Sequence, residues 1–354
     1  MNSKPILSVV IPTVGRPSLL RTVQSLLAAN RSSELEIIVA GAFRDRAAAE
    51  QFAGMAAQNP NIVHLPVSFP RGDSSEKKNA GWRAARAEIV AFIDDDVVVG
   101  RDWPEAVLET FKDGSAGLMS GPGLVPEDIP LMARLAGWTL ASRAAGYVQE
   151  RYVAGSSAPV AVGWSRLIGC NMAYRRKVLE EIGGFDPKFW PGEEMLAAYI
   201  ATARKGYTLV FQPRAVLHHY PRAGFMQFMK QMYGYGATRI RLIRAGTTLE
   251  PLTLAPMAMV AAFLLAAAAA LWFPAVFAPL LVAGVVLYGL FVCWCAAAKW
   301  CGEKDARALL IFFMIPAMHF SYGVAQWIEL FRPGRDLSLK KDSADSAGPG
   351  GAKK

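Results

Sequence analysis

Three consecutive carboxylates, Asp94, Asp95 and Asp96, follow the apolar run 88–93 in the first third of the chain. The run is typical of a buried strand, in which neighbouring side chains point to opposite faces, so we expect Asp94 and Asp96 on one side and Asp95 on the other. Carboxylates this close repel unless a cation or hydrogen-bond donors compensate them. Mg²⁺ or Mn²⁺ takes oxygen ligands and also binds diphosphates. The pattern predicts a metal–diphosphate site, with an acidic turn that binds nothing as the alternative.

The segments around these carboxylates alternate between strand and helix patterns. The patterns predict strands at 6–11, 35–40, 61–65, 89–93 and 207–212, and helices at 18–29, 46–58, 76–86, 103–111, 175–182 and 193–205. This alternation indicates an α/β fold with a doubly wound, mostly parallel, Rossmann-like sheet, whose ligands bind at the carboxyl ends of the strands. Residues 129–160 fit either an acceptor-side insertion or a helix on a membrane surface.

The last third of the chain is strongly apolar. The chain has 354 residues, of which 53% are hydrophobic, and the apolar excess gathers after Leu252. The runs 252–273, 274–298 and 308–330 are each long enough to cross a bilayer as a helix. We therefore expect an all-α transmembrane region after the sheet.

Positive charge flanks the apolar runs. The chain carries a formal net charge of +9, with basic clusters at 239–244 and 332–354. This arrangement fits the inner face of a membrane better than a nucleic acid, which we do not expect as a partner. No secretory signal is evident at the N-terminus, so we expect the N-terminal part in the cytoplasm.

These patterns predict three regions. They are a cytoplasmic domain (1–240), a membrane domain with about three hydrophobic helices (241–331) and a basic, disordered tail (332–354). Three spans would place the basic tail outside, against the charge rule, so a re-entrant third segment is the alternative. The four cysteines fit reduced apolar thiols, because Cys293 and Cys295 lack a second ligand pair for zinc.

Several short motifs occur in a set order. They are Ser8–Thr13, Lys78–Gly81, Ala91–Asp96, Gly169–Arg176, Ile182–Asp186, Gly192–Glu194, Arg204–Tyr207 and Pro213–His219. In this order, over roughly residues 5–240, the chain resembles family-2 glycosyltransferases with the GT-A fold. It looks like the membrane-anchored members that build bacterial exopolysaccharide or lipid-linked glycans. The resemblance implies sugar transfer from a nucleotide-diphosphate sugar.

The resemblance also implies roles for individual residues. Glu194 matches the general base, with Glu193 holding the acceptor, although the two could exchange roles and a first-turn acid is common in helices. Asp96 and His219 match the ligands of Mg²⁺ or Mn²⁺, although His219 could be an ordinary loop histidine. The expected nucleotide-sugar contacts are Pro12, Thr13, Arg16, Lys78, Asn79, Asp94 and Asp95. The expected acceptor contacts are Arg175, Trp190 and Gln231.

The chain departs from the family pattern at three places. Residues 40–42, Ala-Gly-Ala, stand where an acidic residue often contacts the base. Glu194 stands where the family usually has Asp. The Gln-x-x-Arg-Trp motif of processive synthases is absent, and residues 231–236 followed by Arg239 occupy the comparable region.

We therefore expect an inverting, metal-dependent transferase that uses a nucleotide-diphosphate sugar, with uridine as the default base. The expected acceptor is a polyprenyl-linked saccharide that gains one or a few sugars. Membrane lipids and other polysaccharide-assembly proteins are expected partners. Two alternatives remain: a polyprenyl-phosphate sugar synthase, and a catalytically silent membrane scaffold of a polysaccharide assembly complex.

Overall fold

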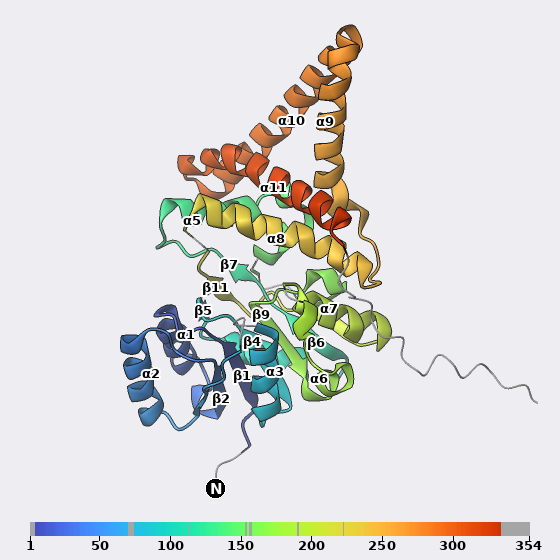
Figure 1. The fold of residues 1–354 in the computed structure, drawn as a ribbon. Coiled ribbons are helices and arrows are strands. Elements are labelled where there is room, and N and C mark those ends of the chain that lie inside the picture. The colour runs from blue at the N-terminus through green and yellow to red at the C-terminus, as the bar shows by residue number, and fades with distance from the viewer. Residues whose placement is uncertain are drawn as a thin grey trace, which may run out of the picture.

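The computed structural model describes residues 4–69, 74–112, 114–152, 154–155, 158–189, 191–221 and 223–333. These residues form an α/β domain, a layer of helices on one end of it, and a helical hairpin that points away from the sheet (Figure 1). Most of the predicted tail, 332–354, lies outside the described residues.

The strands are β1 (Leu7–Pro12), β2 (Leu35–Ala40), β3 (Ile62–Leu65), β4 (Ile89–Ile93), β5 (Val97–Val99), β6 (Ala116–Ser120), β7 (Gly123–Leu124), β8 (Val160–Val162), β9 (Asn171–Arg175), β10 (Thr208–Phe211) and β11 (Leu217–His219). The helices are α1 (Ser18–Leu27), α2 (Arg46–Gln58), α3 (Ser74–Ala84), α4 (Trp103–Thr110), α5 (Leu131–Leu140), α6 (Arg176–Ile182), α7 (Glu193–Tyr199), α8 (Phe225–Arg244), α9 (Ala255–Trp272), α10 (Pro274–Glu303) and α11 (Ile311–Phe331). Single-turn or irregular helices include η2 (Arg143–Tyr152), η5 (Ile200–Arg204) and η7 (Ala306–Leu310).

The main sheet has eight strands in the order β3-β2-β1-β4-β9-β6-β10-β8. The pairs β1/β2, β1/β4, β2/β3 and β6/β10 are parallel. β9 runs antiparallel between β4 and β6, and β8 runs antiparallel to β10 at the edge. The mostly parallel sheet is therefore confirmed, with β9 and β8 as reversed strands that the α/β alternation did not predict.

Helices cover both faces of this sheet. In β1, Val9 and Ile11 belong to the core shared with α1, α2 and α4, whereas Val10 belongs to the core shared with α3, α6 and α7. Because both faces are covered, the inner strands are continuous apolar runs rather than alternating ones. At α2, the side chain of Asp45 caps the helix by accepting a hydrogen bond from Ala48 N at 2.7 Å.

A second, three-stranded sheet stands at the carboxyl end of β4. β11 pairs antiparallel with β5 and parallel with β7. β5 begins directly after Asp96, and its register places His219 opposite Val97. The small sheet thus brings the end of β11 beside the three carboxylates.

The segment 129–160, for which the sequence allowed two interpretations, contains α5 and η2. These helices belong to the layer of helices and not to the sheet. Apolar side chains of α5, α8, α10 and α11 form a third core cluster, which includes Trp138, Phe228 and Met314. Three described helical segments are long and apolar enough to cross a membrane: Pro251–Trp272, Pro274–Glu303 and Ala306–Phe331. The third differs from the other two because 44% of its apolar window is buried inside the protein, against 6% for each of them.

All the predicted helices except 46–58 have somewhat different bounds in the structure, and the differences at 175–182 and 193–205 have a structural explanation. The helix expected at 175–182 begins at Arg176, because Arg175 is the last residue of β9. The helix expected at 193–205 is α-helical only to Tyr199 and continues as a π-helical turn, η5. α6 ends at Gly183, whose φ of 75° lies in the left-handed region, as the Gly183-Gly184 pair predicted.

Asn171 is a buried hub at the start of β9. Its Nδ2 donates to the carbonyls of Pro122 and Ala215 at 2.9 and 2.7 Å, and its Oδ1 accepts from Trp103 Nε1 at 3.0 Å. One amide therefore joins β9 to α4 and to the segments that precede β7 and β11. Removing it leaves buried polar partners unsatisfied.

We predict that Asn171→Ala destabilises the α/β domain by about 2–3 kcal/mol, because three buried partners lose their hydrogen bonds. The midpoint of thermal unfolding in detergent should fall by several degrees. Asn30→Ala is the matched control, since the Asn30 side chain bonds Asp102 and Glu105 at the surface, and it should change stability by less than about 0.5 kcal/mol. Equal midpoints for the two variants would contradict the hub role.

Candidate active site

Asp95 turns toward the end of β1. Its Oδ2 accepts a hydrogen bond from Thr13 Oγ1 at 2.6 Å, and Thr13 Oγ1 accepts one from Gly15 N at 2.9 Å. Arg16 Nη1 lies 3.7 Å from Asp95 and 3.5 Å from Asp96. Burial raises the pKa of Asp95, and the Thr13 hydrogen bond and the Arg16 charge oppose that rise. The structure thus brings together Thr13, Arg16 and Asp95, three of the residues expected on the nucleotide side.

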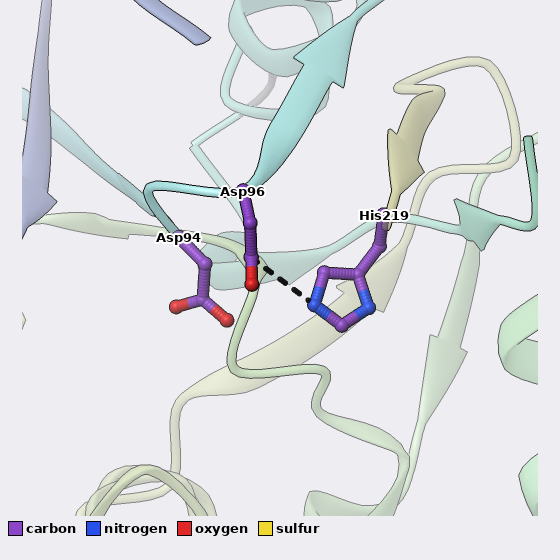
Figure 2. Close-up of side chains that lie close together, drawn as sticks. All are labelled: Asp94, Asp96 and His219. Carbon is purple, nitrogen blue, oxygen red and sulfur yellow. Dashed lines mark ion pairs between the residues drawn. The ribbon is translucent and has the colours of Figure 1, made fainter. Parts of the chain in front are cut away.

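Asp94, Asp96 and His219 lie close together, with Asp96 paired to His219 (Figure 2). One ligand atom from each of these residues lies within 4.8 Å of the other two. His219 Nε2 is 3.3 Å from Asp96 Oδ1. Burial, and then the charge of Asp96, raises the pKa of Asp94 to about 6, with His219 and Lys78 opposing. Two carboxylates and an imidazole are ligands that Mn²⁺ or Mg²⁺ accepts, so the three residues fit a divalent ion.

Lys78 is buried between the two acidic residues that begin α7. Its Nζ lies 3.1 Å from Glu193 Oε1 and also donates to Glu194 Oε1. Burial would raise the pKa of Glu194, but the Lys78 charge and hydrogen bond hold that pKa below its usual value. Burial, and then the charge of Glu194, raises the pKa of Glu193 to about 7. The lysine therefore keeps Glu194 ionised in a site that would otherwise favour its neutral form.

Glu194 stands near the same sheet edge as the aspartates. A Cβ placed on Gly169 would lie 3.1 Å from Glu194 Oε1, so the carboxylate rests against the residue two positions before β9. β9 pairs with β4 so that Asn171 is opposite Ile93, next to Asp94. The charge of Glu194 also contributes to raising the pKa of Asp94. Glu193 is only 2% exposed and lies deeper, whereas 20% of the Glu194 side chain is exposed.

The structure places the remaining predicted residues at different points. Pro12 ends β1, one residue before Thr13. The Asn79 side chain is buried, and its hydrogen bonds are made within the protein. Its Nδ2 donates to the Phe185 carbonyl at 2.7 Å, and its Oδ1 accepts from Phe185 N and Trp82 Nε1. Gln231, on α8, donates to Tyr235 Oη at 2.9 Å. Trp190 lies outside the described residues.

Arg175 is at the wrong end of its strand for the predicted acceptor contact. Its register partner is Ile89, the first residue of β4, whereas the candidate site follows the last. Its guanidinium donates to the carbonyls of Ala116 and Phe111 at 2.8 and 2.7 Å. Arg175 therefore closes the opposite edge of the sheet, and its position does not support the acceptor prediction.

Sequence reasoning missed a group of residues from the layer of helices. The charges of Asp94 and of Arg151 in η2 both influence the pKa of Tyr235, which burial raises. Arg151 also lines a cavity of about 290 Å³ together with Tyr147, Arg166 and Phe211. No motif marks these residues, and the placement of η2 beside the sheet edge is a tertiary feature.

The family comparison agrees with this geometry. Residues 5–234, well over half of the chain, match the model of the family described as glycosyltransferase like family 2. The chain belongs to this family. The expected recognition is confirmed.

Two curated relatives have names from polysaccharide biosynthesis. The succinoglycan biosynthesis protein ExoM of Rhizobium meliloti is 31% identical over 112 residues, 31% of this chain and 36% of that protein. The O-antigen biosynthesis protein RfbC of Myxococcus xanthus is 26% identical over 204 residues, 52% of this chain and 15% of that protein. The chain thus spans about a third or less of the length of these relatives.

A solved structure shares the fold over nearly the whole chain. The mannosyltransferase PcManGT from Pyrobaculum calidifontis, solved with GDP-Man and Mn²⁺, matches with a TM-score of 0.61 and 19% identity. The match covers 92% of this chain and 88% of that chain. The expected GT-A fold is confirmed.

We predict that Asp96→Ala abolishes metal-dependent nucleotide binding, because it removes the carboxylate that lies between Asp94 and His219 in the ligand cluster. Isothermal titration of UDP and GDP in Mn²⁺ should give binding heat with the unmodified protein and none with the variant. Asp186→Asn, at an exposed loop carboxylate, should bind as the unmodified protein does. Equal nucleotide affinity in Mn²⁺ and in EDTA would contradict the metal site.

Proposed function

We propose that this glycosyltransferase moves a sugar from a nucleotide-diphosphate sugar to a polyprenyl-linked saccharide, with inversion at the anomeric carbon. The observation that carries the proposal is that a candidate metal site and a candidate base lie at the same end of the sheet. The cluster of Asp94, Asp96 and His219 can hold a divalent ion, and Glu194 lies near enough for its charge to act on Asp94.

The donor side rests on the ends of β1 and β4. Thr13, Arg16 and Asp95 form a bonded group that can hold the nucleoside and orient its hydroxyls. Mn²⁺ or Mg²⁺ held by Asp94, Asp96 and His219 would act as a Lewis acid toward the leaving diphosphate. We take a uridine nucleotide as the default donor, and GDP-Man in the structural neighbour keeps guanosine as a candidate.

The acceptor side rests on Glu194. In the proposed step the acceptor hydroxyl oxygen forms a bond to the anomeric carbon as the bond to the diphosphate oxygen breaks. The hydroxyl proton passes to the Glu194 carboxylate, and the nucleoside diphosphate leaves with the bonding electron pair. A single displacement inverts the configuration.

Glu194 suits the role of base better than Glu193. It is the more exposed of the two, and Lys78 keeps it ionised and therefore able to accept a proton. Glu193 is buried beneath it and accepts a hydrogen bond from Gly192 N at 3.1 Å. We assign Glu193 to supporting the turn that presents Glu194, and Lys78 to positioning both carboxylates.

A lipid-linked acceptor follows from the surroundings of the site. The cavity lined by Arg151 lies between η2 and the strands β8 and β10, and a guanidinium group binds phosphate oxygens well. The apolar helices α9 and α10 would anchor the enzyme in a membrane, which we take to be the bacterial inner membrane with the catalytic domain in the cytoplasm. The names of the two curated relatives support a role in exopolysaccharide or O-antigen biosynthesis.

We predict that Glu194→Gln lowers kcat about 10²–10⁴-fold, the usual contribution of a general base. Transfer would be followed by mass spectrometry of lipid products after membranes receive a panel of sugar nucleotides. Donor affinity should stay the same, and Glu180→Gln, at an exposed acid of α6, should be fully active. Full activity of Glu194→Gln on a bare lipid phosphate would instead favour the polyprenyl-phosphate sugar synthase, whose acceptor needs no strong base. No turnover with any donor would favour the scaffold.

We predict that Lys78→Met shifts the acid limb of the kcat/KM profile to higher pH by about 1–3 pH units. Loss of the ammonium raises the pKa of Glu194, so the base is protonated, and inactive, up to a higher pH. Lys78→Arg keeps the charge and should leave the limb near its original pH. Lys188→Met, at an exposed lysine, is the matched control. A uniform loss of activity at every pH in Lys78→Met would contradict the electrostatic role.

A further inference from the structure

α11 lies beside α8 and runs in the same direction (Figure 1). Near the start of the contact, Ser321 Oγ donates to the Met229 carbonyl at 2.8 Å. Further along, Gly236 abuts Tyr322, since a Cβ on Gly236 would lie 2.2 Å from the Tyr322 carbonyl oxygen. Residues further along α8 contact residues further along α11, so the two helices are parallel.

The far ends of the two helices are joined by an ion pair and a hydrogen bond. Arg241 Nε lies 2.9 Å from Glu329 Oε1, and Arg244 Nη2 donates to the Leu330 carbonyl at 2.7 Å. Glu329 is only 6% exposed. α11 is therefore held to α8 at this end by a buried carboxylate rather than only by apolar packing.

α8 is too polar to cross a bilayer. It contains Lys230, Arg239, Arg241 and Arg244 among its twenty residues, together with Gln227 and Gln231. Arg or Lys at the centre of a spanning helix is strongly unfavourable. Since α8 stays out of the hydrocarbon core, a helix that runs along it stays at the same depth.

α9 and α10 are different in kind. They pack against each other as a hairpin that extends away from the sheet domain (Figure 1). Residues 252–298 contain no charged side chain, and both helices expose large apolar side chains along their length, such as Leu265 and Leu287. This hairpin has the length and composition to enter the bilayer core.

α11 also exposes an apolar stripe on one face. Phe313, Phe320, Ile328 and Phe331 are all at least 47% exposed, and their spacing of seven, eight and three residues places them on one side of a helix. Ile311, Ile315 and Met318 on the other side are buried in the third core cluster. Like the surface of the hairpin, this stripe consists of large apolar side chains.

We propose that the chain crosses the membrane only as the α9–α10 hairpin, and that α11 lies in the plane of one leaflet on top of α8. The partner of the exposed stripe is the acyl region of that leaflet, and the partner of the basic residues at the ends of the three helices is its anionic headgroups. These basic residues are Arg244, Lys299, Arg307 and Arg332. A two-crossing topology places all of them on the side of the catalytic domain, in agreement with the charge rule that three spans would break.

The first test measures depth along α11. Phe313→Cys, Phe320→Cys and Ile328→Cys would be made in a Cys293→Ser/Cys301→Ser background, which removes the two exposed thiols of the described residues. Each variant would be spin-labelled and reconstituted in vesicles of phosphatidylcholine with about one-quarter phosphatidylglycerol, an anionic lipid. Power saturation with oxygen and a nickel complex then gives the depth of each label.

An in-plane α11 gives the same shallow depth for all three labels. A spanning α11 would separate the labels at 313 and 328 by about 22 Å along the membrane normal, at 1.5 Å per residue, and that result would overturn the proposal. Labels at Phe263→Cys and Leu271→Cys on α9 are the positive control, because they should differ in depth by about 12 Å if α9 crosses the bilayer. The absence of this gradient on α9 would also overturn the proposal.

A second test reads the topology directly in the full chain. Epitope tags before residue 1 and after residue 354 would be digested by protease in right-side-out and in inside-out membrane vesicles. Two crossings expose both tags in the same vesicle preparation, whereas three crossings expose them in opposite preparations. Neither readout requires activity, so failure of the proposed transfer reaction and failure of this topology are separate results.

Discussion

The repulsion among Asp94, Asp95 and Asp96 is the constraint on which the rest of the site depends, because adjacent carboxylates at a strand end need separate partners. The alternation of side-chain directions along the chain gives them different partners. Asp95 turns to Thr13 after β1, Asp94 and Asp96 lie with His219 at the end of β11, and Arg16 reaches both Asp95 and Asp96. The parallel pairing of β1 with β4 and the antiparallel pairing of β5 with β11 supply these partners, so both registers serve the chemistry as well as the fold.

Much of this arrangement could be predicted from the sequence. Period-2 alternation alone divides the three aspartates between two faces, and apolar runs between helical patterns indicate the mostly parallel sheet. The link between Asp96 and His219 required the family resemblance, since they are 123 positions apart and β11 is only three residues long. A strand so short carries no readable register of its own.

Tertiary context explains what the sequence did not indicate. Lys78 and Asn79 were expected to contact the nucleotide sugar, yet both are buried because α3 packs under the segment before α7. Arg175 lies within a motif segment, but β9 is reversed, which carries its last residue away from the site. The missing acid after β2 also has a local reason. Gly41 has a φ of 149°, and a Cβ there would lie 2.0 Å from the Thr13 carbonyl oxygen, so this position holds no side chain.

α8 touches the turn that presents the two glutamates. Thr238 Oγ1 donates to the Pro191 carbonyl at 3.0 Å, and a Cβ on Gly192 would lie 2.3 Å from Thr238 Cγ2. α8, the helix that carries α11, therefore also helps to set the position of Glu194. With α11 resting in the leaflet, a change in acyl-chain packing would reach Glu194 through α8, by way of this hydrogen bond and this contact. Transfer by enzyme in micelles and by enzyme in liposomes would then differ, even when every side chain in the cleft is the same.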